Sequence, residues 1–177
     1  LNGDVVLLGA GSFAGTAITK RITLRGAGQT QTLLGPCSIT AAGGSVTNRM
    51  VLSHLGFEGT GTGRALQLNA SFVSLLNVSV NNFNYGIDIA SATPTTLTDL
   101  LFDGLVTNNN FYGVFVNSRV TINGFTIQNH YEELNEFAVY FSAYGAGPLP
   151  IAKSYVNNLT VRNSFYLNTK DRSFYLE

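Results

Sequence analysis

Four side chains occupy the same place in a repeated pattern and are the residues best suited to contact a ligand: Gln67, Asp88, Phe115 and Tyr140. Each is the outward residue of a short segment in which its two flanking residues are apolar. If successive segments stack as strands about 4.8 Å apart, the four side chains form one continuous strip. Two aromatic rings beside an amide and a carboxylate are typical of a surface that binds polysaccharide.

A second interpretation of the two rings stays open. Phe115 and Tyr140 also suit a structural role, as cross-strand partners that the loop Ser142–Lys153 covers. Another aromatic row, which we expect to be structural, stands just before the Gly or Ala of each segment. It consists of Tyr85, Tyr112 and Phe137.

The strip depends on a repeat that runs through most of the chain. Val73–Asn82 is followed by Leu100–Asn109 and then by Val120–Asn129, and each copy alternates apolar and polar residues before a closing Asn. Shorter matches extend the repeat in both directions, to give six copies at unequal spacing. The equivalent apolar positions of the six copies are Ile22, Leu55, Val78, Leu105, Phe125 and Leu159.

A constant strand core with unequal loops predicts a stack of coils, because a propeller blade needs four strands and about 40 residues or more. We expect an all-β fold, a right-handed parallel β-helix (a single-stranded solenoid) of about six to seven coils, with three parallel sheets and almost no helix. Two inward ladders are expected: Leu55, Val78, Leu105, Phe125 and Leu159 in one, and Phe57, Val80, Ile127 and Val161 in the next.

Length and composition narrow the class of protein. The chain of 177 residues is expected to form a single domain over residues 1–175, and we interpret Leu176 and Glu177 as a cloning scar. Charged residues are 11% of the chain, against about 25% in typical soluble domains, and the formal net charge is zero. Without a basic block we expect no nucleic-acid partner, and without an apolar run of about 18 residues we expect no membrane span.

The first coil carries a family resemblance. Gly3–Gly28 opens with Gly-Asp and an apolar strand, continues with Gly-x-Phe-x-Gly, and ends with Ile-Thr-Leu-x-Gly-x-Gly. This order resembles the opening of pectin-lyase-like right-handed parallel β-helix proteins, and PbH1-type repeats extend the resemblance over most of the chain. A dinucleotide-binding turn at Val5–Gly11 would need a helix next, whereas Thr16–Leu24 is rich in β-branched residues.

The resemblance implies a fold more than an activity, because this superfamily includes lyases, hydrolases, epimerases, tailspikes, adhesins and non-catalytic binders. Its hydrolases use clustered Asp residues with a His and an Arg-x-Lys segment, which the chain lacks. Its lyases use calcium held by several acids, plus a basic residue. The candidate acids here are Asp88, Asp99 and Asp103, which fall on different strands and in a loop, and the candidate base is Arg64 or Arg119.

We therefore expect no catalytic residue, no metal and no cofactor, with calcium entering only if the chain is part of a lyase. The sequence favours an extracellular or cell-surface domain that binds a polysaccharide or another surface ligand along one face without catalysis. Two alternatives stay open: a fragment of a polysaccharide lyase or glycoside hydrolase, and a structural stalk or adhesin spacer. Exposed strand edges also predict either a cap made by Phe165–Tyr175 or end-to-end self-association.

Overall fold

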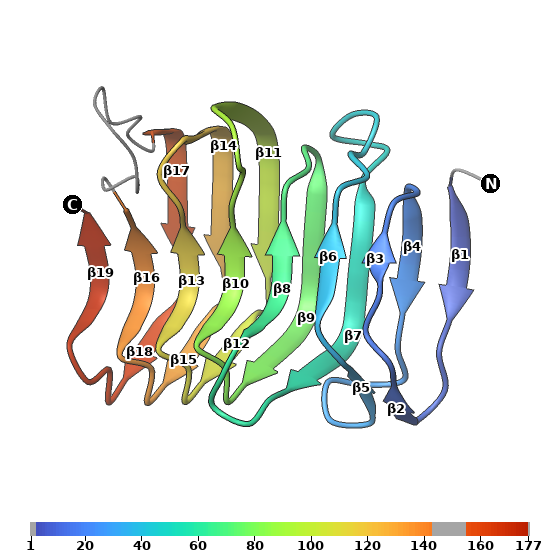
Figure 1. The fold of residues 1–177 in the computed structure, drawn as a ribbon, viewed down its shortest axis with the longest axis horizontal. Helices are drawn as coiled ribbons and strands as arrows, with labels where there is room; N and C mark the ends of the chain where they lie inside the picture. The colour runs from blue at the N-terminus through green and yellow to red at the C-terminus, as the bar shows by residue number, and fades with distance from the viewer. Residues whose placement is uncertain (1–2, 143–154, 177) are drawn as a thin grey trace.

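The chain folds as a parallel β-solenoid, in which the strands of successive coils lie side by side along one long axis (Figure 1). The computed structural model describes residues 3–142 and 155–176. Those residues contain strands, turns and bends but no helix, and therefore no helix that could cross a membrane. The all-β parallel solenoid that the repeats predict is confirmed.

One face of the solenoid is a seven-stranded parallel sheet. Its strands are rich in Val, Ile, Leu and aromatic residues, which pack well on a pleated surface. They are, in chain order, β3 Ala17–Ile18, β6 Cys37–Ile39, β8 Arg64–Leu68, β10 Tyr85–Ile89, β13 Tyr112–Val116, β16 Phe137–Phe141 and β19 Arg172–Leu176. Leu176 therefore ends a strand, whereas Glu177 lies outside the described residues.

The rest of the coil forms a twelve-stranded parallel sheet, in which five short strands continue a main row of seven around a corner. The main row is β1 Asp4–Leu7, β4 Ile22–Arg25, β7 Met50–Glu58, β9 Val73–Asn81, β11 Thr95–Asp103, β14 Val120–Gln128 and β17 Tyr155–Arg162. The short strands are β2 Gly11–Phe13, β5 Thr32–Leu34, β12 Val106–Asn108, β15 Tyr131–Glu133 and β18 Phe165–Leu167.

The corner is made by residues in the left-handed backbone conformation. His54 in β7 and Asn77 in β9 have φ values of 54° and 52°. Strand β9 nevertheless stays paired on both sides of Asn77, with β11 before the bend and with β12 after it. The prediction of three separate sheets is therefore wrong, because β7 and β9 run through the bend and join two of the expected sheets into one.

The solenoid makes about five turns, slightly fewer than the six to seven expected. Five coils open on a strand of eight or nine residues, namely β7, β9, β11, β14 and β17. The earlier strands have only two to four residues, and β1 and β2 are exposed along their whole length. The N-terminal coils thus repeat the pattern without forming full-sized turns.

Two of the predicted registers between coils are wrong, each by five positions. Phe125 pairs with Leu100, although the repeat predicted Leu105. The equivalence of Ile22 and Leu55 likewise places Leu24 beside Phe57, but Leu24 pairs with Leu52. A shift of five residues between neighbouring strands leaves inward-facing residues on the inner side, because apolar positions and bends recur every five residues in a long strand such as β14.

The other three predicted registers are confirmed by the pairing of the strands. Leu55 of β7 pairs with Val78 of β9, and Phe125 of β14 pairs with Leu159 of β17. Between them, Val80 of β9 pairs with Thr107 of β12, as the equivalence of Val78 and Leu105 requires.

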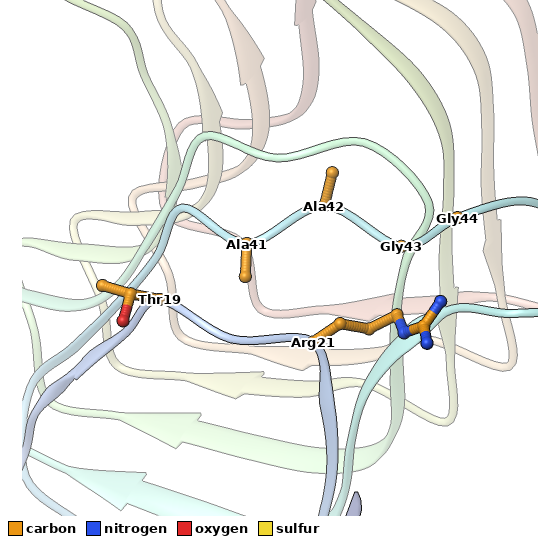
Figure 2. Close-up of a pocket in the computed structure, with 6 residues that line it drawn as sticks. All are labelled: Thr19, Arg21, Ala41, Ala42, Gly43 and Gly44. Carbon is orange, nitrogen blue, oxygen red and sulfur yellow. The ribbon is translucent and has the colours of Figure 1, made fainter. Parts of the chain in front are cut away.

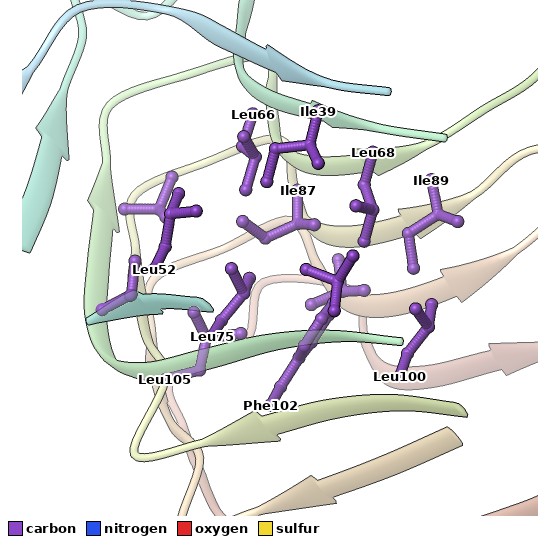
Figure 3. Packing of buried hydrophobic residues seen from close by; sticks show 14 of the residues in the cluster. Ile39, Leu52, Leu66, Leu68, Leu75, Ile87, Ile89, Leu100, Phe102 and Leu105 are labelled. Atoms are coloured by element: carbon purple, nitrogen blue, oxygen red, sulfur yellow. The ribbon is translucent and has the colours of Figure 1, made fainter. Parts of the chain in front are cut away.

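Apolar side chains from the two sheets meet inside the coil. Figure 3 shows Leu66 and Leu68 of the seven-stranded sheet facing Leu75 and Phe102 of the other sheet, and all four are fully buried. Phe102 also meets Phe125 of the next coil edge to face, with ring centroids 5.0 Å apart. This continuous core is what holds successive coils together.

Most residues predicted to point inward do so. Leu159 and Val161 are 38% and 37% exposed, because β17 pairs only with β14 among the described strands. The first predicted ladder, however, combined residues from two different rows. Phe125 stacks between Leu100 and Leu159. Leu55 and Val78 pair with each other in the part of β7 and β9 that follows the left-handed bend. The predicted inward residues that are fully buried are Leu55, Val78, Leu105, Phe125, Phe57, Val80 and Ile127.

Candidate functional site

The four candidate ligand-binding residues lie in one register on the outer side of the seven-stranded sheet. Asp88 of β10 pairs with Gln67 of β8 on one side and with Phe115 of β13 on the other. Phe115 in turn pairs with Tyr140 of β16. The structure therefore brings all four together as neighbours in adjacent strands, as the spacing of the repeat predicts.

Asp88 is not the solvent-facing carboxylate that its outward position suggested. Its side chain is 1% exposed and forms an ion pair with Arg64, whose own side chain is 51% exposed. Burial raises the pKa of Asp88, and the Arg64 guanidinium acts in the opposite direction. Because the guanidinium covers the carboxylate, Asp88 positions Arg64 and presents no oxygen to a ligand.

The row predicted to be structural merges with the candidate strip. Tyr85, Tyr112 and Phe137 stand in register, and their rings stack with centroids 5.2 and 5.4 Å apart. They also contact the rings of the strip, since Tyr85 lies 5.2 Å from Phe115 and Tyr112 lies 5.1 Å from Tyr140. The two rows therefore form one surface rather than two.

The merged surface continues into the last strand. Tyr175 of β19 pairs with Tyr140, and the two ring centroids are 4.7 Å apart. The sequence predicted either a cap made by Phe165–Tyr175 or end-to-end self-association, and it did not predict that Tyr175 extends the row of rings. A sequence signal for this row exists in β13, β16 and β19, where an aromatic residue or Arg is followed three positions later by an aromatic residue. We call the six half-buried rings of this surface the aromatic ladder: Tyr85, Tyr112, Phe115, Phe137, Tyr140 and Tyr175.

A cation stands at each end of the aromatic ladder. Arg64 of β8 lies 5.3 Å from the centroid of the Tyr85 ring, and Arg172 of β19 lies 4.4 Å from the centroid of Tyr175. Both arginines occupy the register position of Tyr85 and Phe137 in their own strands. Each side chain is about half exposed, so the guanidinium groups face solvent as well as the rings.

The rings of the ladder cover one another's faces. Phe115 and Tyr140 are 5.5 Å apart with an interplanar angle of 23°. At this separation two nearly parallel rings are stacked with an offset and cover each other in part. Phe115 and Tyr140 therefore contact each other and are not two independent ring faces. The loop Ser142–Lys153, expected to cover the rings, lies almost wholly outside the described residues.

Gln67 differs from Asp88 in being accessible. It is exposed and lines a hollow of about 200 Å³ at the end of the ladder's register. The hollow opens beyond the ends of β6, β8 and β10, where small residues such as Ala90, Ser91 and Ala92 leave space. Asn69 contributes a second amide to its lining. A recess that carries two side-chain amides among small and apolar residues thus lies at the Gln67 end of the register.

The acids considered for a lyase site do not converge. Asp99 forms an ion pair with Arg49 at 2.6 Å, and Asp103 accepts hydrogen bonds from Gln128 and Asn129. Each of these carboxylates therefore already bonds to side chains of another coil. The described residues hold no group of three or more His, Cys, Asp or Glu side chains placed to bind a metal ion.

A buried polar cluster, which the sequence did not predict, lies inside the last coils. His130 is fully buried, and its Nε2 lies 2.9 Å from the Thr107 hydroxyl. Glu132, also fully buried, accepts hydrogen bonds from the Asn135 amide and the Thr169 hydroxyl at 3.0 and 2.6 Å. Glu132 lies in strand β15, and His130 directly precedes this strand.

Burial explains the acid–base properties of this cluster. It lowers the pKa of His130 to about 4 and raises the pKa of Tyr166 to about 12. It also raises the pKa of Glu132, whereas the hydrogen bonds from Thr169 and Asn135 act in the opposite direction. The cluster is closed off from solvent and carries no open position for a substrate, so we interpret it as part of the core.

No protein-family model, curated protein or solved structure matches the chain. The β-solenoid is therefore established by the pairing of its strands. Membership of the pectin-lyase-like superfamily stays a hypothesis.

Proposed function

We propose that this solenoid is a non-catalytic extracellular or cell-surface domain that binds a polysaccharide along the outer face of its seven-stranded sheet. The observation that carries the proposal is the aromatic ladder together with the accessible Gln67 beside it. Parallel strands repeat about every 4.8 Å, which gives an extended chain of sugars a contact at each coil. Four of the six rings are Tyr, so hydroxyl groups that can bond to sugar hydroxyls recur along the face.

The resemblance to pectin-lyase-like β-helix proteins supports this proposal at the level of fold. Extracellular proteins that handle polysaccharides are numerous in that superfamily, and the opening Gly3–Gly28 segment resembles their first coil. The absence of converging acids in the described coils favours binding over cleavage. Calcium has no role in this proposal.

The test is binding to a panel of soluble polysaccharides, measured as retardation in affinity gels. Ala at Phe115 and Tyr140 is a poor choice of variant, because each ring contacts neighbouring rings that are worth about 0.5–1.5 kcal/mol a pair. The double variant Phe115→Leu, Tyr140→Leu keeps apolar volume and removes the rings and the hydroxyl. We expect it to keep its far-UV circular dichroism and to lose about tenfold in affinity, or about 1.4 kcal/mol.

Matched controls separate this face from the rest of the molecule. Gln67→Ala should weaken binding of the same polysaccharide without changing stability, since Gln67 is exposed. Thr121→Ala and Thr126→Ala, on the outer side of the twelve-stranded sheet, should leave binding unchanged. Unaltered binding in the Leu double variant would refute the proposal, and cleavage of the polymer with an unsaturated product would replace it with the lyase alternative.

A structural stalk is the second candidate function, and the mutual stacking of the rings favours it. Rings that cover one another's faces stabilise adjacent coils without any ligand. On this alternative the Leu double variant loses thermal stability while no polysaccharide in the panel retards either protein. Thermal melts of the same samples distinguish the two functions.

A further inference from the structure

A hollow of about 250 Å³ opens at a corner between the two N-terminal coils. Its lining is Thr19 and Arg21, which follow β3, and the segment of Ala41, Ala42, Gly43 and Gly44, which follows β6. Figure 2 shows the Arg21 side chain extended toward Gly43 and Gly44. Arg21 is the single charged residue of the lining, so the hollow has a positive potential.

The guanidinium of Arg21 has donor groups that the rest of the described chain does not use. Its Nε atom is buried without a hydrogen-bond partner among residues 3–142 and 155–176. Arg49 and Arg64, by contrast, each hold a carboxylate. A buried donor without an acceptor is unfavourable, so the protein itself does not saturate the hydrogen-bonding capacity of this guanidinium.

Glycine residues leave room for the guanidinium. A Cβ atom at Gly44 would lie 3.1 Å from Arg21 Nη1, and one at Gly3 would lie 3.4 Å from Nη2. The contact at Gly44 would be tight, whereas the one at Gly3 would be ordinary van der Waals contact. Gly44 is therefore the position where a side chain would crowd the guanidinium.

The backbone of the corner is held by its own hydrogen bonds. The amides of Gly43 and Gly44 donate to the carbonyl oxygens of Ser71 and Asn48 at 2.8 and 2.7 Å. Among the lining residues, Arg21 and Thr19 are the two whose side chains carry hydrogen-bond donors. No carboxylate is present in the lining to compete for them.

We propose that this hollow binds one oxyanion group, a carboxylate, sulfate or phosphate, through the guanidinium of Arg21. The planar fork of an Arg side chain matches such groups with two parallel N–H···O bonds. Ala and Gly in the opposite wall admit the oxygen atoms without a steric conflict. The site does not depend on the aromatic ladder, so it can be tested separately from polysaccharide binding.

The experiment is a ¹H–¹⁵N NMR titration of the whole chain with sodium sulfate, sodium phosphate or sodium glucuronate at constant ionic strength. Sodium chloride and glucose serve as the anion and sugar controls. We expect the amides of Thr19, Gly43 and Gly44 to shift and saturate with an affinity on the order of millimolar. Saturation by glucuronate alone identifies a carboxylate of an acidic sugar, and saturation by sulfate or phosphate identifies a tetrahedral oxyanion.

Three variants decide the result. Arg21→Gln should weaken binding at least about tenfold, and Arg21→Lys should restore part of it, since Lys keeps the charge but not the fork. Arg25→Gln removes an exposed cation of the neighbouring strand β4 outside the hollow and should change nothing. The proposal is overturned if Arg21→Gln, folded by circular dichroism, binds as tightly as the parent. It is also overturned if chloride produces the same shifts as the oxyanions.

Discussion

Asparagine is the most frequent residue at the left-handed bends of the described chain. Such bends disfavour other L-residues because Cβ approaches the following carbonyl, whereas the short amide of Asn tolerates them. Asn82 and Asn109 stand at equivalent bends of adjacent coils, and the amide of Asn109 donates to the Asn82 side-chain oxygen at 2.7 Å. Leu134 occupies the same row in the next coil with φ of 61°, although it has no amide to bond to its neighbours.

Leu134 is therefore a site where one substitution should stabilise the fold. It is 40% exposed, so replacing it removes little buried apolar area. We expect Leu134→Asn to raise the free energy of unfolding by about 0.5–1 kcal/mol, since a bulky residue in this conformation costs about 1–2 kcal/mol. Urea denaturation measures the change. Leu167→Asn, at an exposed strand position, should bring no gain, and an equal gain there would show that the backbone is not the cause.

The buried His130 should make the fold sensitive to acid. Burial lowers its pKa from 6.5 to about 4, so the folded state prefers the neutral ring. The stability that this preference supplies is complete above about pH 6.5 and is lost as the pH falls toward 4. The loss is at most about 3 kcal/mol. We expect urea denaturation between pH 7 and 4 to show a smaller decline in His130→Gln than in the parent, and equal declines would contradict the assignment.

The buried Glu132 should make the fold less stable as the pH rises, which is opposite to the effect of His130. Burial raises its pKa, so the folded state prefers the protonated acid, and the stability this supplies is lost as the pH rises through the folded pKa. Glu132→Gln keeps an oxygen that can accept the Asn135 amide and cannot ionise. We expect this variant to gain stability over the parent at pH 8 and none at pH 4. Thermal melts at both values give the comparison, and a pH-independent difference would argue against ionisation.

At the scale of elements, the long strands are built from units of five residues. In the units Val120–Gly124 and Phe125–Asn129, the first and third residues point inward and the fifth is a left-handed bend. If one such strand is shifted by five residues against its neighbour, apolar residues still lie beside apolar residues and a bend still lies beside a bend. This is why the predicted equivalence of Leu105 and Phe125 was wrong by one unit, and it explains the second error in the same way.

Whether a strand residue points inward or outward predicts how strongly a charged substitution at that position destabilises the fold. Ile127 of β14 is fully buried between Phe102 and Val161 in its row. Ile127→Asp should cost about 3–5 kcal/mol, because a carboxylate would enter a core without a partner. Thr126→Asp, one position away and half-buried on the outer side, should cost less than about 1 kcal/mol. Thermal unfolding of both variants measures the difference, and similar losses would mean that the side assignment is wrong.

At the scale of the whole molecule, exposed apolar side chains gather in the terminal strands. Val5 and Leu7 of β1 are 63% and 71% exposed, and Phe165 of β18 is 66% exposed. Within residues 3–142 and 155–176, β1 pairs only with β4, and β17 pairs only with β14. These strands present both apolar surface and unpaired backbone groups, which is the combination that promotes strand addition.

The expectation of end-to-end self-association stays a prediction, and the edge of β17 is the place to test it. Sedimentation velocity from micromolar to millimolar protein should show a rising weight-average mass. Val161→Lys places a charge on the partly exposed inner side of β17 and should keep the protein monomeric over the same range. A parent protein that is monomeric at every concentration would exclude this association.

The sequence by itself determined the class of fold and the two faces of each strand. Alternation of apolar and other residues assigns a side to each position, and a regular closing Asn or Gly marks the bends, so both are local properties of the chain. The register of Gln67, Asp88, Phe115 and Tyr140 followed from the same alternation. The inward direction of residues such as Val80 and Ile127 was predicted for the same reason.

Only the tertiary structure decided which coil lies against which and what covers each side chain. Neighbouring five-residue units are interchangeable in pattern, so the pairing of Leu100 with Phe125 depends on contacts between coils. Asp88 is buried because Arg64 of the preceding coil lies over it, and the two aromatic rows merge because their rings meet across strands. The polar core around Glu132 is likewise satisfied by hydrogen bonds from turns, one of them in the following coil. Contacts between coils join residues far apart in the chain, and local alternation does not predict them.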